Sequence, residues 1–554
     1  MFVRTKRVKN TRGETLEYLV LVESVWDKGR VRQRTLVNLG RKDQLDPGQI
    51  DAMLKAMSPL GDKIQAINVA EGLGLEEALE YGPLPVLHRL WEDLGLGPSL
   101  RKALAGHAYT SPVEAAVFAM VASRIMRPAS KLATSRWLSG VYWPGFDEVK
   151  LHHLYLGLDV LEEHKETIEA DLWNRTLDLF ALDLDLVLMD TTNVYFHGET
   201  AGDLAQFGHS KEKRFDKRLV SIALLVTKEG IPIGHEVLPG NTHDSVAFRK
   251  GLDALRNRFK VKRVIIAADR GMVSEKLLKE LREAGLEYVV GVRMRGYRLA
   301  EDAISRSGAR WQTITPGRLL VKTVPWKKER LLVCLNPEER KRDRAIRADI
   351  LASLREELRT GSASGLIRNS RFRPFVSVDQ DAVELDMYKV REAARYDGKY
   401  VLRTNIPELP SAEVATLYKQ LWRVERAFRD LKGPLELRPV WHWTDPRIKG
   451  HVMVCFLAYA IEMAFQTSIQ KAVPNPDAPA TGEADYHEIM EDLSRLKVVT
   501  FNIDGRQMAV RTDLLGRAFD AFKAVGLRPP PKVLRDSKSD PGLVPISGSE
   551  SAMP

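Results

Sequence analysis

The chain has few cysteines and no long apolar run. Its 554 residues include two cysteines, Cys334 and Cys455, which are far apart and in no CxxC pair. A structural zinc site of the usual cysteine-rich kind is therefore not expected, and low cysteine use is typical of proteins in a reducing cytoplasm. Because no uncharged stretch of about 18 apolar residues is present and the basic N-terminus has no apolar segment, we expect neither a membrane span nor a secretory signal.

Phosphate-binding loops and internal repeats are absent as well, since the sequence contains neither a P-loop nor a GxGxxG motif. Hydrophobic residues make up 44% of the chain, which is enough for a substantial core. The length suggests about three or four domains. The net charge of +10 favours polyanionic partners such as nucleic acids, because neutralised phosphates release counterions.

The first 42 residues predict a basic β-hairpin. Residues 16–26 and 30–39 have strand character, and Asp27-Lys28-Gly29 between them suits a turn. Alternating arginines would share one face of the second strand: Arg30, Arg32 and Arg34. That face is either a phosphate-contacting surface or a solvated strand face, and the sequence favours neither.

A helical region follows, from about residue 84 to residue 180. Pro128, Ala129 and Ser130 separate a long helix from a short one. This helix–break–helix segment either contacts DNA or is a plain scaffold. Its cations are Arg124, Arg127, Lys131 and Arg136.

A mixed sheet is predicted next, with an acid after two of its strands. The signals between residues 182 and 292 have the order β-β-β-α-β-α-β, typical of a mixed sheet flanked by helices. Asp190 follows the strand LVLM, and Asp269 follows the strand IIAA. Acids at the rim of a sheet can form a site, although an Asp there also commonly caps a turn.

A third acid, Glu425, lies in a helix predicted from Ser411 to Gly433. Apolar residues at helical spacing predict its buried face: Val414, Leu417, Leu421, Val424, Phe428 and Leu431. A second stripe runs along the margin of that face: Tyr418, Trp422, Glu425, Arg429 and Lys432. Acid, cation and aromatic together suit a phosphate-bearing substrate. The alternative is a surface ladder in which Glu425 pairs with Arg429.

Three converging carboxylates would make a site for a hard divalent cation. Mg²⁺ takes few carboxylates and keeps waters and substrate phosphate oxygens as its other ligands. Two such ions can activate an attacking oxygen and stabilise a leaving one at phosphorus. Asp and Glu suit this chemistry because they are anionic at neutral pH, whereas His and Cys favour softer metals.

With these residues the chain resembles the insertion-sequence DDE transposases, whose catalytic core is like that of RNase H. The resemblance spans about residues 182–470 and is interrupted by an inserted segment. In the subgroup that it resembles, a helix signature places Arg three, Glu seven and Lys fourteen residues after a Tyr. Tyr418, Glu425 and Lys432 match this signature, whereas Leu421 stands at the Arg position.

Other residues carry the resemblance further. Asp269-Arg270 resembles the second-acid motif, and Trp422 matches a Trp that resembling enzymes use to hold a base flipped from the duplex. The cations that could replace the signature Arg are Arg423, Arg426 and Arg429, of which the first two are expected to point away from the stripe.

The resemblance implies a mixed α/β fold, in which an RNase H-like catalytic core with an inserted subdomain follows a basic β-hairpin region and a helical domain. The expected segments are 1–75 (β-rich, DNA-contacting), 76–180 (helical), 181–292 and 398–475 (the two parts of the core), 293–397 (the insertion), 476–528 (a C-terminal segment) and 529–554 (a disordered tail).

The resemblance also implies that Asp190, Asp269 and Glu425 bind two Mg²⁺ or Mn²⁺ ions. Water would cut a phosphodiester at the end of the element, and the freed 3′-OH would attack another phosphate. The partner would be double-stranded DNA, both inverted-repeat ends and target, held by a homodimer in a bacterial or archaeal cytoplasm. The implied DNA contacts are Tyr418, Trp422, Arg429, Lys432 and Arg270.

Two other functions fit parts of the sequence. A DNA-binding protein without catalysis needs only the basic hairpin, the helical region and the positive charge. A nuclease with the same core needs the three acids but no strand transfer.

Overall fold

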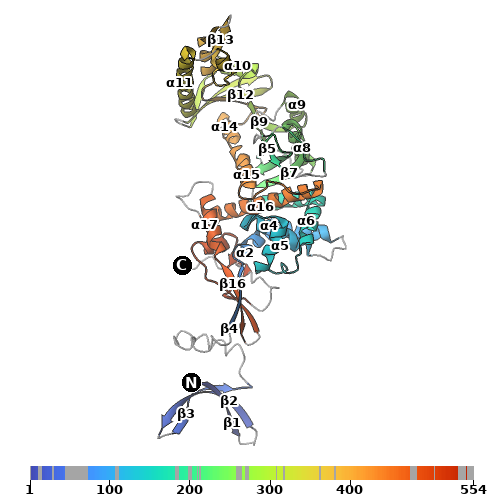
Figure 1. The fold of residues 1–554 in the computed structure, drawn as a ribbon, viewed down its shortest axis with the longest axis vertical. Coiled ribbons are helices and arrows are strands. Elements are labelled where there is room, and N and C mark those ends of the chain that lie inside the picture. Colours follow the sequence, from blue (N-terminus) through green and yellow to red (C-terminus); the bar gives the residue numbers. More distant parts are fainter. Residues whose placement is uncertain are drawn as a thin grey trace. The chain divides into compact units, whose positions relative to one another are not determined.

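The structure is a computed structural model, drawn in Figure 1. It describes residues 2–9, 15–27, 30–43, 73–105, 112–180, 186–197, 202–208, 210, 214–257, 265–268, 274–306, 308–315, 318–360, 363–379, 382–473, 483–503, 506–534 and 544–545. The chain divides into two compact units. These are Met1–Glu76 with Phe501–Gln507, and Glu77–Thr500 with Met508–Pro554. The seven segments expected from the sequence stay a prediction.

The N-terminal strands form a three-stranded antiparallel sheet of order β1-β2-β3. The strands are β1 (Phe2–Lys9), β2 (Thr15–Asp27) and β3 (Arg30–Arg41). β2 and β3 are the predicted hairpin, with Asp27 opposite Arg30. Glu23 pairs with Arg34, so part of the cationic excess is neutralised within the sheet. The side chains of Arg30 and Arg32 lie outside the described residues.

A nine-stranded sheet forms the centre of the second unit. Its order is β10-β11-β12-β15-β9-β8-β5-β6-β7. The strands in chain order are β5 (Leu186–Tyr195), β6 (Leu219–Thr227), β7 (Pro232–Pro239), β8 (Ile265–Ala268), β9 (Glu287–Val292), β10 (Trp311–Thr315), β11 (Leu319–Trp326), β12 (Glu329–Leu335) and β15 (Lys399–Thr404). β5, β6 and β7 are antiparallel, whereas β8 pairs in parallel with both β5 and β9. These five strands have the RNase H-like arrangement, and the predicted fold class is confirmed.

Helices cover both faces of this core (Figure 1). They are α8 (Asp244–Asn257), α9 (Glu275–Glu283), α14 (Ser411–Lys419), α15 (Trp422–Lys432) and α16 (Asp445–Ala472). Because side chains alternate along a strand, β5 contributes to two cores. Leu188 packs in one core with Val424 of α15, whereas Met189 packs in the other with Phe248 of α8.

The segment between β9 and β15 extends the central sheet and adds a small core of its own. β10, β11 and β12 extend the central sheet through the pairing of β12 with β15. The remaining elements are α10 (Arg298–Ser305), α11 (Pro337–Thr360), α12 (Ala363–Arg368), η3 (Arg373–Phe375), β13 (Val376–Asp379), β14 (Ala382–Leu385) and α13 (Met387–Ala394). A small core of its own includes Leu354, Phe372 and Val390.

The helical region consists of α2 (Pro83–Asp93), α3 (Leu96–Leu104), α4 (Val113–Met126), α5 (Lys131–Trp137), η2 (Leu138–Gly140), α6 (Leu151–Glu163) and α7 (Lys165–Phe180). The break before α5 is confirmed, and the Ser130 hydroxyl caps α5 by accepting a hydrogen bond from the Ala133 N–H. Two of the cations considered for DNA contact, Arg124 and Lys131, are buried. The scaffold interpretation is therefore favoured for this pair.

The helix α16 is long and strongly apolar. Its best 18-residue window has a mean hydropathy of 1.6, so by length and composition alone it would be able to cross a membrane. That window is 89% buried inside the protein, against α4, α6 and α15 among others. Such burial is typical of the core helix of a globular protein.

The C-terminal elements are α17 (Glu483–Ser494), β16 (Lys497–Ile503), β17 (Arg506–Arg511), α18 (Ala518–Ala524), β18 (Leu527–Arg528), β19 (Val533–Leu534) and β20 (Val544–Pro545). A four-stranded sheet has the order β19-β17-β16-β4, with β4 at Leu73–Glu80. The segment expected to be a disordered tail thus contains two short strands, β19 and β20. β19 pairs with β17, and β20 pairs with β18.

Candidate active site

Asp190 lies in the middle of β5 and not at its end, which corrects the position predicted from the sequence. Asp190 faces Leu224 of β6, and this antiparallel pairing continues to Tyr195. The β-branched residues after Asp190 favour strand and prolong it. The parallel pairing with β8 is shorter, and its last printed pair is Leu188 with Ala267. Asp190 therefore lies beside the carboxyl end of β8.

The alternation of β5 gives Asp190 and Thr191 opposite faces. Thr191 donates a hydrogen bond of 2.7 Å from its hydroxyl to the Asp244 carboxylate, at the start of α8. Asp190 accepts a 2.7 Å hydrogen bond from the Thr191 N–H at Oδ1. Because Leu188 and Val194 pack in the core that includes α15, Asp190 is on the α15 side of the sheet.

Asp269 and Arg270 lie outside the described residues. The last described residue of β8 is Ala268, which pairs with Val290 of β9. Among the described residues, no three His, Cys, Asp or Glu side chains group in a way that would hold a metal ion. Because Asp269 is missing from that set, the proposed group of three acids stays a prediction.

The helix predicted from Ser411 to Gly433 is two helices, α14 and α15, separated at Gln420 and Leu421. Between the two helices the backbone hydrogen bonds join residues three apart, as in a 3-10 turn. They run from the Gln420 N–H to the Leu417 carbonyl and from the Leu421 N–H to the Tyr418 carbonyl. Neither Gly nor Pro marks this step in the sequence, so helical periodicity alone gave no sign of it.

The apolar face of α14 and α15 is confirmed, since Val414, Val424 and Leu431 are buried in the main core. The marginal stripe is open to solvent to different degrees. Trp422, Glu425 and Arg429 are exposed, whereas Tyr418 and Lys432 are half-buried. Glu425 forms no ion pair with Arg429 or with any other described residue, so the surface-ladder alternative is not observed.

The position of Leu421 does not suit the arginine of the signature, because the Leu421 side chain is 8% exposed and packs in the main core. The three candidate cations differ sharply. Arg423 lies 4.9 Å from the centre of the Trp422 ring and donates a 3.0 Å hydrogen bond to the Glu229 carbonyl. Burial lowers the pKa of Arg423. This contact fixes Trp422 against the β6–β7 turn.

Arg426 is buried. Its guanidinium donates to the Asp430 carboxylate at 3.3 Å and to the Gln466 side chain of α16 at 2.9 Å. Arg429 is therefore the one of the three that faces solvent, with a side chain that is 69% exposed. Of the cations weighed for the signature position, Arg429 is the one available to a phosphate.

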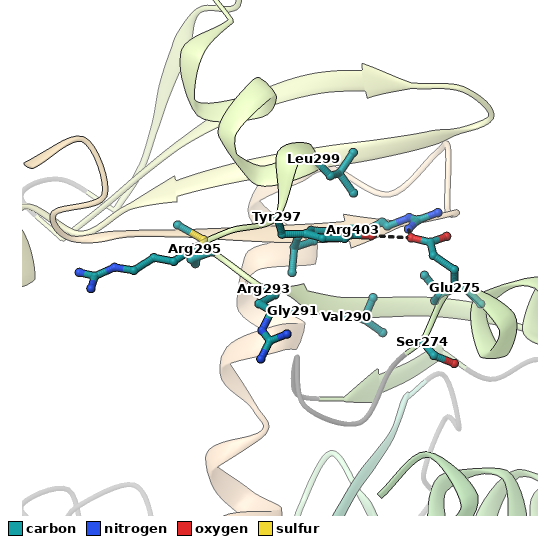
Figure 2. Close-up of a pocket in the computed structure, with 12 residues that line it drawn as sticks. Ser274, Glu275, Val290, Gly291, Arg293, Arg295, Tyr297, Leu299 and Arg403 are labelled. Carbon is teal, nitrogen blue, oxygen red and sulfur yellow. Dashed lines mark hydrogen bonds and ion pairs between the residues drawn. The ribbon is translucent and has the colours of Figure 1, made fainter. Parts of the chain in front are cut away.

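A cavity of about 1050 Å³ opens at the carboxyl end of β9 (Figure 2). Glu275 at the start of α9 accepts hydrogen bonds from Arg403 at 2.5 Å and from the Tyr297 hydroxyl at 2.8 Å. Burial opposes the effect, but these hydrogen bonds hold the pKa of Glu275 below its usual value. Arg293 and Arg295 line the same cavity, and both are exposed.

Sequence reasoning missed Arg293 and Arg295. The signal was present, because the two arginines alternate with Val292 and Met294 directly after a buried strand. In Figure 2 both arginine side chains extend away from the Glu275 cluster.

Comparison with known proteins gives three findings. Residues 182–461 match the family model described as "Transposase DDE domain", and residues 3–67 match "IS1634 family transposase, N-terminal domain". No curated protein matches the chain. A solved structure, a piggyBac transposase synaptic complex with hairpin DNA, aligns at a TM-score of 0.36 and 10% identity, over 76% of this chain and 84% of that one.

Proposed function

We propose that this protein, which belongs to the DDE transposases of insertion sequences, cuts and rejoins DNA at a site formed by Asp190, Asp269 and Glu425. The observation that carries the proposal is the placement of the first and third acids. Asp190 lies on the face of the sheet that packs against α15, and Glu425 lies exposed on α15.

The alternation of side chains along β8 would place Asp269 on the same face of the sheet as Asp190. Ile265 and Ala267 belong to the same core as Leu188, and Asp269 is the next position of that alternation in the sequence. Ala267 pairs with Leu188, two residues before Asp190. Two neighbouring parallel strands and one helix on their shared face would thus each supply one acid.

The donor set fits a divalent metal. All three ligands are carboxylates, and Glu425 has no competing cation among the described residues. Asp190, Asp269 and Glu425 would hold two Mg²⁺ or Mn²⁺ ions, which would supply activation of the attacking oxygen and neutralisation of phosphate charge. Since carboxylates are anionic near neutral pH, they keep this capacity under physiological conditions.

The reaction would proceed in two displacements at phosphorus. In the first, the oxygen of water bonds to phosphorus and the bond from phosphorus to the 3′ oxygen breaks, which leaves a 3′-OH and a 5′-phosphate. In the second, that 3′ oxygen bonds to another phosphorus, loses its proton and displaces a new 3′ oxygen. The acids position the attacking oxygen in line with the leaving one.

DNA contacts would come from the rest of the stripe. Arg429 and Lys432 would hold backbone phosphates, Tyr418 would position the cut strand, and Trp422 would stack on a displaced base. Arg270 would add a cation beside the second acid. Arg293 and Arg295 extend this set of cations along the same edge of the sheet.

Assembly would involve two copies of the chain, because two ends of one element must be joined together. The double-stranded partner would include both inverted-repeat ends and a target. Transfer can be tested with a pre-cut end that carries a free 3′-OH. Joining of that end to plasmid DNA by the wild-type protein supports a transposase, whereas cutting without joining supports a nuclease.

The test of the site is a cleavage assay on DNA from the ends of the element, with Mg²⁺. Glu425→Gln is expected to reduce cleavage by about a thousandfold or more, because a metal ligand is lost without a change of shape. Glu413→Gln is the matched control, since Glu413 is also exposed and lies on α14. Full cleavage by Glu425→Gln would refute the assignment.

A further inference from the structure

Exposed aromatic side chains gather around the far end of β5, beyond Asp190. Phe207, Phe215 and Trp441 are 60%, 65% and 69% exposed. Tyr195 and His197, at the end of the strand, are half-buried. These five residues are called the aromatic surface below. Large exposed rings that gather in one place mark a binding site more often than rings scattered singly.

Backbone hydrogen bonds fix the segments that carry these rings. The His197 N–H donates to the Val440 carbonyl at 3.2 Å, and the Val440 N–H donates to the Tyr195 carbonyl at 3.3 Å. Gln206 and Leu219 exchange two hydrogen bonds of 3.0 and 2.8 Å. The rings are therefore presented by a framework tied to the core sheet.

Some of these rings stack on one another, and arginines lie over the rings of Tyr195 and Phe207. His197 stacks on Trp441, with centroids 5.0 Å apart and planes 24° from parallel. Three guanidinium groups lie over ring faces. They are Arg214 over Tyr195 at 5.0 Å, Arg438 over Tyr195 at 5.6 Å and Arg218 over Phe207 at 5.5 Å. Stacked rings with adjacent cations suit a ligand that alternates flat bases with phosphates.

Two of the nearby acids contact other groups, whereas Asp203 and Glu436 are exposed. Asp216 pairs with Arg214 at 2.9 Å. Asp445, at the start of α16, accepts a hydrogen bond of 3.0 Å from the Asp203 N–H. Arg218 is exposed and has no ion pair with any described residue. Arg218 is thus available to a phosphate on this surface.

We propose that the aromatic surface binds an unpaired DNA strand, whose bases stack on Trp441 and Phe207 while its phosphates lie near Arg218 and Arg438. An intact duplex would not use the rings, because its base faces are already stacked on one another. The inference rests on the proposed function, since Tyr195 lies on the same strand as Asp190, about 17 Å further along it. The Tyr195 side chain is on the opposite face of the sheet from Asp190, so a strand released by cutting would have to pass around the end of β5 to meet these rings.

The test measures binding of a fluorescent single-stranded oligothymidine to the full chain by anisotropy, in EDTA at one fixed salt concentration. The double variant Phe207→Ala with Trp441→Ala is expected to bind this strand about tenfold more weakly than the wild type. Its affinity for a duplex of the same length is expected to stay within about twofold. Phe519→Ala, an equally exposed ring on α18, is the control and should change neither affinity.

Three outcomes would overturn the inference. They are unchanged affinity for the single strand, an equal loss for single strand and duplex, and a change from dimer to monomer by light scattering with no change in DNA affinity. The last would make the surface an interface between copies of the chain. Because binding is measured without metal, a wild-type protein that cuts no DNA would refute the proposed function and leave this result standing.

Discussion

Leu421 is the residue at which this chain departs from the signature of the transposases that it resembles. Since Leu421 is buried in the main core, an arginine there would need to bury its guanidinium among apolar side chains. Leu421→Arg is expected to lower the free energy of unfolding by about 3 kcal/mol or more, and not to raise DNA cleavage. Urea denaturation and the cleavage assay measure the two effects.

Leu421→Met is the control for this substitution, because it keeps the volume and should cost less than about 1.5 kcal/mol. A stable Leu421→Arg variant with faster cleavage would show that the signature position reaches DNA after all. Arg429, exposed one turn after Glu425, would then not be the replacement cation.

On α15, the burial of some side chains could be predicted from the sequence and that of others could not. Helical spacing correctly predicted the burial of Val424, and it placed Glu425 at the margin of the buried face, where its side chain is exposed. It gave no sign that Arg426 is buried. The partner of Arg426, Gln466, comes from a helix forty residues later, and a local period cannot indicate a contact of that range.

At the scale of elements, a buried polar network attaches α15 to α16. Arg426 bonds Asp430 and Gln466, and Gln466 donates to Glu462 at 3.1 Å. Arg426→Met is expected to lower the free energy of unfolding by about 3–5 kcal/mol, because Asp430 keeps its buried charge and loses its buried cation, with the exposed Arg429 left at 3.9 Å. Urea denaturation measures this value.

The matched control is Arg429→Met, at the exposed neighbouring cation, which should change the free energy of unfolding by less than about 0.5 kcal/mol. Equal effects of the two substitutions would contradict the network as a support of α15. A loss of cleavage by Arg429→Met at unchanged stability would fit its proposed role at a phosphate.

The packing of α5 gives a prediction on pH. Burial, and to a smaller extent the charge of Arg124, lowers the pKa of Lys131 to about 7. Between pH 7 and about 10.5 the unfolded chain therefore binds more protons here than the folded one. The free energy of unfolding should therefore rise as the pH increases from 7 to about 10.5. Below pH 7 the folded protein carries the full cost of the buried charge on Lys131.

Lys131→Met removes this titration. The variant should be more stable than the wild type at pH 7, and the difference in free energy of unfolding should shrink as the pH rises toward 10.5. Lys102→Met, at an exposed lysine, is the control and should show no such trend. A difference that stays constant from pH 7 to 10 would contradict the shifted pKa.

Element boundaries were predicted less well than element types. The hairpin of β2 and β3 and the short helix α5 followed from turn and cap residues that act locally. The extension of β5 past Asp190 is supported by its β-branched residues and by its pairing with β6, which lies more than twenty residues later in the chain. The step at Gln420 is marked by no Gly or Pro in the sequence.

At the scale of the whole molecule, one sheet organises the second unit. Three antiparallel strands and two parallel ones form its centre, and the segment after β9 extends it through β12 and β15. This topology pairs β5 with β8 and packs α15 against β5, although more than 200 residues separate Asp190 from Glu425 in the sequence. The order of the strands in the sheet could not be predicted from the sequence pattern, because pairing between distant strands has no local signal.

The central claim is that three acids share divalent ions in the DNA-bound protein. Anomalous diffraction from crystals of the full chain with element-end DNA and Mn²⁺ tests it most directly. We expect anomalous peaks within about 2.5 Å of carboxylate oxygens from Asp190, Asp269 and Glu425. Peaks that involve other residues, or carboxylates of these three that bind no common ion, would contradict the account.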